Sequence, residues 1–67
     1  MGDNENDLHR VEQLVLEARR IVQQQKGLIV RLRAAGADTS SAEMTLRFFE
    51  RNLKRFQEYG DLLKAKS

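Results

Sequence analysis

The chain has 67 residues and no cysteine, and its 12 basic and 10 acidic side chains leave a formal net charge of +2. This length allows one small domain with a modest core, and the absence of cysteine excludes disulfides and thiolate metal sites. The single His9 cannot hold zinc alone, no apolar run is long enough to cross a bilayer, and no signal-peptide pattern opens the chain. We therefore expect a cytoplasmic protein without a cofactor that gains its missing stability by self-association.

The first half of the chain is patterned as one long helix. Residues 1–6 are polar and lack periodicity, so they predict a disordered tail. From residue 7 to residue 35, apolar side chains recur at three positions of a seven-residue repeat. The first position holds Leu8, Val15, Val22 and Ile29, the second Val11, Ala18, Gln25 and Leu32, and the third Leu14, Ile21, Leu28 and Ala35. This stripe is wider than a two-stranded coiled coil needs.

Residues 36–40 predict a short turn. Gly36 is suited to the left-handed conformation that ends many helices. Ser40 and Glu43 have the spacing of a capping box, in which the two residues satisfy each other's free backbone N–H groups. Because the connection is short, the two helices should be antiparallel neighbours.

The second helix is expected over residues 41–64, with residues 65–67 frayed. Its apolar seam alternates in steps of four and three residues: Ala42, Leu46, Phe49, Leu53, Phe56, Gly60 and Leu63. Gly60 either ends the helix or lets two backbones approach closely. The pattern favours a continuous helix, because the register that we predict sets Gly60 against the small Ala18.

The predicted register follows from the seam and from a ladder of charges on one side of it. Seam layers pair Leu32 with Leu46, Ile29 with Phe49, Gln25 with Leu53, Val22 with Phe56, Ala18 with Gly60, and Val15 with Leu63. The ladder pairs Glu12 with Lys64, Arg19 with Gln57, Lys26 with Glu50, and Arg33 with Glu43. No pair sets like charges together, which is typical of the flanks of two facing helices.

The other side of the predicted hairpin is apolar and indicates an interface. Its expected residues are Leu14, Ile21, Leu28, Phe48, Asn52, Tyr59 and Leu62. Such a patch usually marks an association surface, and twofold symmetry is the commonest way to close one. We therefore predict an all-α fold, a two-helix antiparallel hairpin that dimerises into a four-helix bundle. A tetramer and a swapped dimer stay open as alternatives. Gln25 and Asn52 either form hydrogen bonds within this interface or reach water at its rim.

Catalysis is not expected. Thr39, Ser40 and Ser41 have a sufficient role in the turn, and His9 lies about a helix length away. The acidic start of the chain lacks the glycine and terminal glutamate of a calcium loop. Leu16 and Val30 fall on the side away from the proposed interface, where a helix of an unidentified protein partner is one interpretation. We expect a non-enzymatic interaction module that binds itself, with no membrane and no small-molecule substrate.

The alternative function is a small nucleic-acid-binding regulator. Its phosphate contacts would come from basic residues outside the ladder: Arg20, Arg31, Arg47, Arg51 and Arg55. Acidic residues interrupt this set, so we favour a solvated and salt-bridged helix face as its explanation. Steeply salt-dependent retention on RNA or heparin would favour the alternative.

The run Leu32-Arg33-Ala34-Ala35-Gly36-Ala37-Asp38-Thr39, followed by Ala42, Glu43, Leu46, Phe49 and Glu50, resembles a group of short uncharacterised bacterial proteins. These helical-hairpin proteins share a basic first helix, a Gly-x-Asp-Thr turn and a Phe-Glu pair in the second helix. The resemblance covers residues 8–63. It implies the hairpin and a bacterial source, and it implies no activity.

Overall fold

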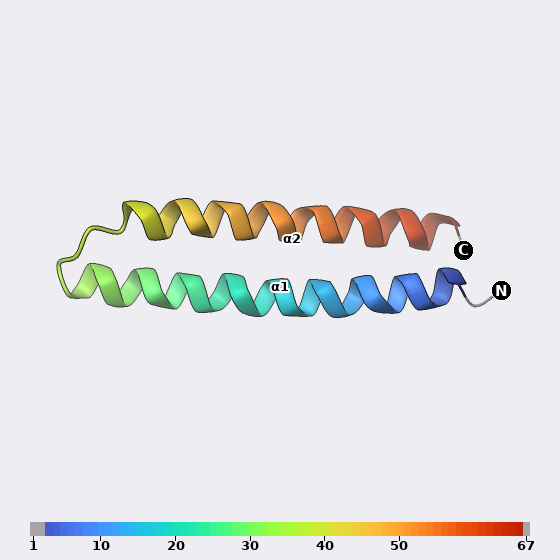
Figure 1. Ribbon diagram of the computed structural model, residues 1–67, viewed down its shortest axis with the longest axis horizontal. Helices are drawn as coiled ribbons and strands as arrows, with labels where there is room; N and C mark the ends of the chain where they lie inside the picture. The colour runs from blue at the N-terminus through green and yellow to red at the C-terminus, as the bar shows by residue number, and fades with distance from the viewer. Residues whose placement is uncertain (1–2, 67) are drawn as a thin grey trace.

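The computed structural model describes residues 3–66, which form two long helices joined by one turn (Figure 1). Helix α1 spans Asp3–Ala34 and helix α2 spans Ser40–Lys66. The helices lie antiparallel and side by side, and the Cα atoms extend over 54 × 14 × 12 Å. The prediction of an all-α hairpin is therefore confirmed over the described residues. Neither helix, within that range, combines the length and apolar character that a bilayer span requires.

Both helices are longer than the sequence pattern predicts at the open end of the hairpin, which is the end opposite the turn. Helix α1 begins at Asp3 instead of residue 7, so residues 3–6 of the expected tail are helical. Helix α2 continues past residue 64 to Lys66, into the part expected to fray. Nothing interrupts either extension, because no glycine or proline occurs between residues 3 and 7 or between residues 61 and 66. The remaining residues of these two predictions, 1, 2 and 67, lie outside the described range.

Gly36 ends α1 as predicted. It has a φ of 74°, in the left-handed region that glycine adopts without strain. Its N–H donates to the carbonyl of Arg33 at 3.0 Å, and the N–H of Ala37 donates to the carbonyl of Leu32 at 2.9 Å. This pair of bonds is the Schellman motif, which reverses the chain at the end of a helix. The chain therefore returns alongside the last turn of α1 before α2 begins, as Figure 1 shows.

The capping box predicted between Ser40 and Glu43 is wrong. Glu43 instead accepts a hydrogen bond from Thr39, with 2.6 Å between Oγ1 and Oε2. Ser40 donates to Oδ1 of Asp38, from its backbone N–H at 2.9 Å and from its hydroxyl at 2.7 Å. The backbone bond closes an Asx-type turn, and the Ser40 hydroxyl is bonded to the same carboxylate oxygen on the preceding side. The backbone bond, and then the hydroxyl bond, hold the pKa of Asp38 below its ordinary value.

The predicted register between the helices is wrong by one heptad. Gly60 meets Val11 and not Ala18, because a Cβ built on the glycine would lie 3.3 Å from Cγ1 of Val11. At the other end, Nε2 of Gln25 donates across the helices to the carbonyl of Ala42 at 2.9 Å. The Schellman reversal explains the shift, because α2 starts beside α1 and not beyond its end.

The shift moves every seam residue of α1 to a new partner. Extended along the whole seam from the approach of Gly60 to Val11, a shift of one heptad implies layers of Leu8 with Leu63, Val15 with Phe56, Ala18 with Leu53, Val22 with Phe49, Gln25 with Leu46, and Ile29 with Ala42. This register covers the first turns of α1, which the predicted register left unpaired. Accordingly Val11 and Leu63 are both buried. Gly60 is buried inside a continuous α2, so the prediction of an uninterrupted helix is confirmed.

Three of the four predicted pairs of the charge ladder border a common hollow: Glu12 with Lys64 and Arg19 with Gln57 in one, and Arg33 with Glu43 in another. Over the described residues, no ion pair joins Lys26 to Glu50 or Arg33 to Glu43. A shift of one heptad would also set Lys26 against Glu43 and Arg19 against Glu50, but over the described residues no ion pair joins either of these pairs. Lys26, Arg33 and Glu43 all border one hollow between the helices, so Glu43 lies near both its predicted and its shifted partner. The ladder still avoids like charges, because its residues also repeat every seven positions.

The hairpin has a thin core. Its buried apolar residues are Val11, Ala18, Val22, Ile29 and Leu63. None of the described side chains falls below 2% exposure. Two helices can cover only a narrow seam between them, so the third apolar position of each heptad stays outside it.

Candidate self-association surface

Both helices carry large apolar side chains in contact with solvent outside the seam. Six of the seven residues predicted for the interface are apolar or aromatic, and each is between 36% and 61% exposed: Leu14, Ile21, Leu28, Phe48, Tyr59 and Leu62. Leu14, Ile21 and Leu28 repeat every seven residues, which places them on one side of α1. We call the seven residues predicted for the interface, these six together with Asn52, the apolar flank.

A hollow joins the two helices near the middle of the apolar flank. Leu14 and Ile21 border it from α1, and Asn52 borders it from α2. Its remaining lining is Glu17, Ala18, Phe49 and Phe56. The hollow shows that Ile21 and Asn52 border the same space, on neighbouring helices.

Phe49 and Phe56 belong to this surface, although the sequence pattern assigned them to the seam alone. Both are half-buried and line the hollow. The ring centroids of Phe48 and Phe49 lie 6.2 Å apart, with a tilt of 53° between the ring planes. Such tilted pairs are favourable for aromatic rings. The pair makes the exposed Phe48 continuous with the hollow. The signal was available, because these seam positions directly neighbour the outer apolar row on a helical wheel.

The two polar residues predicted near the interface have different surroundings. Gln25 neither meets Asn52 nor points to the rim, because it donates to the carbonyl of Ala42 on the facing helix. Asn52 is half-buried beside the hollow. Its amide forms no hydrogen bond with any described residue. Gln25 therefore acts within one hairpin, whereas the amide of Asn52 stays available to a second molecule.

The opposite flank is charged and only sparsely apolar. Leu16 and Val30 are exposed there, and each borders a separate hollow among charged residues. The hollow near the helix ends includes His9, Glu12 and Asp61. Among the described residues, however, no group of three or more metal-ligating side chains is placed to hold an ion. We call this side the charged flank.

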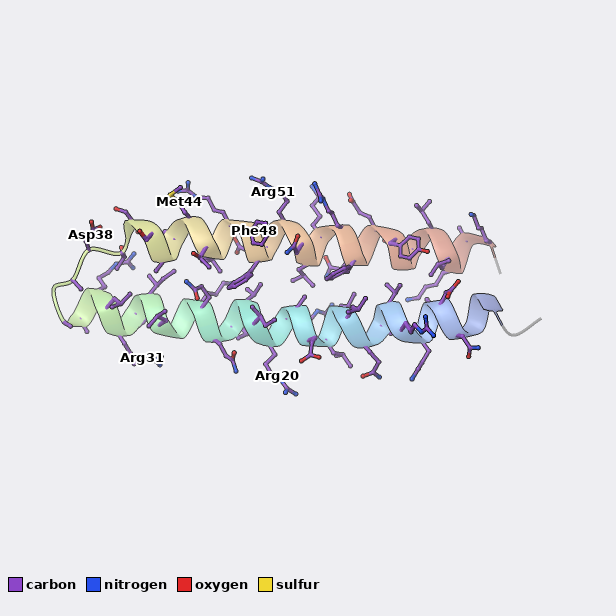
Figure 2. The ribbon with its side chains drawn as sticks, viewed as in Figure 1. Arg20, Arg31, Asp38, Met44, Phe48 and Arg51 are labelled. Atoms are coloured by element: carbon purple, nitrogen blue, oxygen red, sulfur yellow. The ribbon has the colours of Figure 1, made fainter. Side chains whose placement is uncertain are left out.

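The arginines proposed for nucleic-acid binding do not gather on one face. Figure 2 shows Arg20 and Arg31 projecting from α1 on the side away from α2, and Arg51 projecting from α2 on the side away from α1. The five arginines of that set are all exposed: Arg20, Arg31, Arg47, Arg51 and Arg55. Because the labelled members point in opposite directions, the five arginines do not form one strip, although Arg47, Arg51 and Arg55 share one side of α2 by their spacing of four residues.

Comparison of the chain with protein-family models, with curated proteins and with solved structures finds no match.

Proposed function

We propose that this protein is a non-enzymatic self-associating module, and that two hairpins pack through their apolar flanks to form a four-helix bundle. The observation that carries the proposal is the exposure of six large apolar side chains outside the seam, three of which share one side of α1. Contiguous apolar patches of this kind usually mark an interaction surface. A second copy is the occupant that we favour, because the same patch on both partners closes a twofold contact.

The energetics favour an interface that uses the whole flank. Fully burying one such side chain is worth about 1.5–3 kcal/mol, and these side chains are already partly covered in the hairpin. Association costs roughly 4–15 kcal/mol in lost freedom. Two or three contacts would not offset that cost, whereas the flanks of two copies together would. The thin core of the single hairpin adds to the benefit of pairing.

Nucleic-acid binding is less well supported. It needs basic side chains that converge on one surface, and Arg20 and Arg51 point away from each other across the short dimension of the rod. The apolar flank also has no role in such binding. We therefore retain self-association as the proposed function.

Light scattering of the purified protein tests the proposal. One chain has a mass of 7.8 kDa, and we expect a mass near twice this value at micromolar concentration. Ile21→Glu and Leu28→Glu each place a charge on the apolar flank and should reduce the mass to that of one chain. Val30→Glu is the matched control, because Val30 is at least as exposed but lies on the charged flank. A native mass near one chain, or dissociation by Val30→Glu alone, would contradict the proposal.

A further inference from the structure

We infer that the two hairpins associate in reversed orientation, with the turn of one beside the helix ends of the other. The twofold axis then crosses the rod near Ile21 and Asn52. This inference rests on the proposed function, and it names the geometry of that same interface. A twofold axis along the rod is the competing arrangement, in which both turns lie at the same end.

The distribution of charge along the rod favours the reversed orientation. The half that contains the turn, residues 18–53, carries seven basic and three acidic residues, a net charge of +4. The half that contains the helix ends, residues 3–17 and 54–66, carries five basic and seven acidic residues, a net charge of −2. Reversed association brings the positive half of one copy to the negative half of the other. The competing arrangement places like halves together, and such juxtaposition opposes association.

The polarity is strongest within α1 itself. All five acidic residues of this helix precede Ala18: Asp3, Glu5, Asp7, Glu12 and Glu17. Five of its six basic residues follow Ala18: Arg19, Arg20, Lys26, Arg31 and Arg33. With the axis across the rod, α1 lies antiparallel to the partner's α1. The acidic part of each helix then faces the basic part of the other.

Asn52 gives an independent reason for the same orientation. Its amide is half-buried at the hollow and has no hydrogen-bond partner among the described residues. With the axis across the rod, Asn52 lies opposite the partner's Asn52, and two amides can each donate to and accept from the other. In the competing arrangement it lies opposite the partner's Ile21, which leaves a polar group unpaired. An unpaired buried polar group costs free energy, so a central asparagine can select one orientation.

The apolar row of α1 is compatible with this axis. Leu14 and Leu28 lie equally far from Ile21 along the helix, seven residues to either side. Rotation about an axis at Ile21 therefore brings Leu14 onto the partner's Leu28, and Ile21 onto its own copy. The row is self-complementary without any further adjustment.

Distance measurement between two spin labels tests the orientation. A label is attached at Ala37→Cys, an exposed site in the turn that belongs to no proposed interface. About 15 residues of helix separate Ile21 from the turn in each copy, so at 1.5 Å per residue we expect a label separation of roughly 45–50 Å. The competing arrangement brings the two turns within about 20 Å, the width of two helices. Light scattering of the labelled protein is recorded on the same sample.

Each outcome has one interpretation. A dimer with the long separation supports the inference, and a dimer with the short separation overturns it while leaving the proposed function intact. A single-chain mass overturns the proposed function itself.

Ile21→Cys gives a second readout, because oxidation should link two copies through this residue only when the axis crosses the rod there. Asn52→Leu should let a short separation appear beside the long one. A single long separation in that variant would show that Asn52 does not select the orientation.

Discussion

Gly60 approaches Val11 so closely that a Cβ atom on the glycine would lie 3.3 Å from Cγ1 of the valine. Both residues are buried, and they lie near the open end of the hairpin. Valine is branched at Cβ and has little freedom to rotate away. The missing side chain at residue 60 therefore sets how closely α1 and α2 approach at this end.

Gly60→Ala should destabilise the protein despite the better helix propensity of alanine. The propensity gain is about 1 kcal/mol, whereas overpacking a filled contact costs roughly 1–3 kcal/mol. We expect a net loss of up to ~2 kcal/mol in the free energy of unfolding, measured by urea denaturation at fixed protein concentration. Gly27→Ala is the matched control. Its Cβ would meet only the end of the Arg31 side chain at 3.6 Å, so it should stabilise the protein by about 1 kcal/mol.

The same substitution tests the register. Val11→Ala removes the Cγ1 atom that a residue 60 side chain would meet, so Gly60→Ala should cost less in the Val11→Ala background than in the native one. Contacting residues show such coupling, and distant residues do not. Gly60→Ala combined with Ala18→Gly should be additive. Coupling to Ala18 and none to Val11 would restore the register predicted from the sequence.

The register could not be predicted from periodicity, and the reason is physical. Seam, flank and charge positions all repeat every seven residues, so a shift by one heptad preserves apolar contact in the seam and avoids like charges in the ladder. The helices themselves were predictable because amphipathic periodicity and Gly36 mark them locally. What distinguishes the two registers is the path of the turn. That path depends on the hydrogen bonds of Asp38 and Thr39, which replace the capping box that the sequence predicts between Ser40 and Glu43.

Gln25 is expected to stabilise the observed register. Its bond to the carbonyl of Ala42 crosses from α1 to α2, and Gln25→Ala should cost about 1 kcal/mol in the free energy of unfolding. Gln25→Glu gives a sharper test, because an ionised carboxylate cannot donate to a carbonyl whereas a carboxylic acid can. The stability of Gln25→Glu relative to the native protein should therefore recover as the pH falls below about 4, near the ordinary pKa of glutamate. A pH-independent difference would show that the bond does not contribute.

Gly36 should be intolerant of other residues for a reason of backbone conformation alone. Its φ of 74° is unfavourable for an L-residue by roughly 1–2 kcal/mol, and a Cβ there would meet no atom within 4 Å. Gly36→Ala should therefore lower the free energy of unfolding by about that amount, as measured by the urea midpoint. Gly36→Asn is the control, and its free energy of unfolding should fall less, because asparagine tolerates the left-handed region better than alanine does. Equal losses in the two variants would mean that the turn rearranges.

The residues of the apolar flank were easier to identify than their neighbours across the seam. Membership of a flank depends only on the heptad position within one helix, so Leu14, Ile21 and Leu28 stay on the same side in either register. The hollow was not predictable, because it depends on which residues of α2 lie beside Ile21. A helical wheel could have shown that Arg20 and Arg51 each point away from the seam of their own helix. That the two side chains point in opposite directions follows only once both helices are placed.

Asp38 should make stability depend on pH in the acid range. Two hydrogen bonds from Ser40 lower the pKa of its carboxyl group from 3.8, so the folded state favours the ionised form. This contribution is present in full above the unfolded pKa and is lost as the pH falls through the lower folded value. The melting temperature of Asp38→Ala should therefore lie below that of the native protein at neutral pH, and the difference should shrink below about pH 4. Asp38→Asn keeps a hydrogen-bond acceptor but not the charge, so its melting temperature at neutral pH should fall less than that of Asp38→Ala. The difference in melting temperature between these two variants should not change in the acid range. A constant difference between the native protein and Asp38→Ala across the acid range would show that the cap acts without the carboxylate charge.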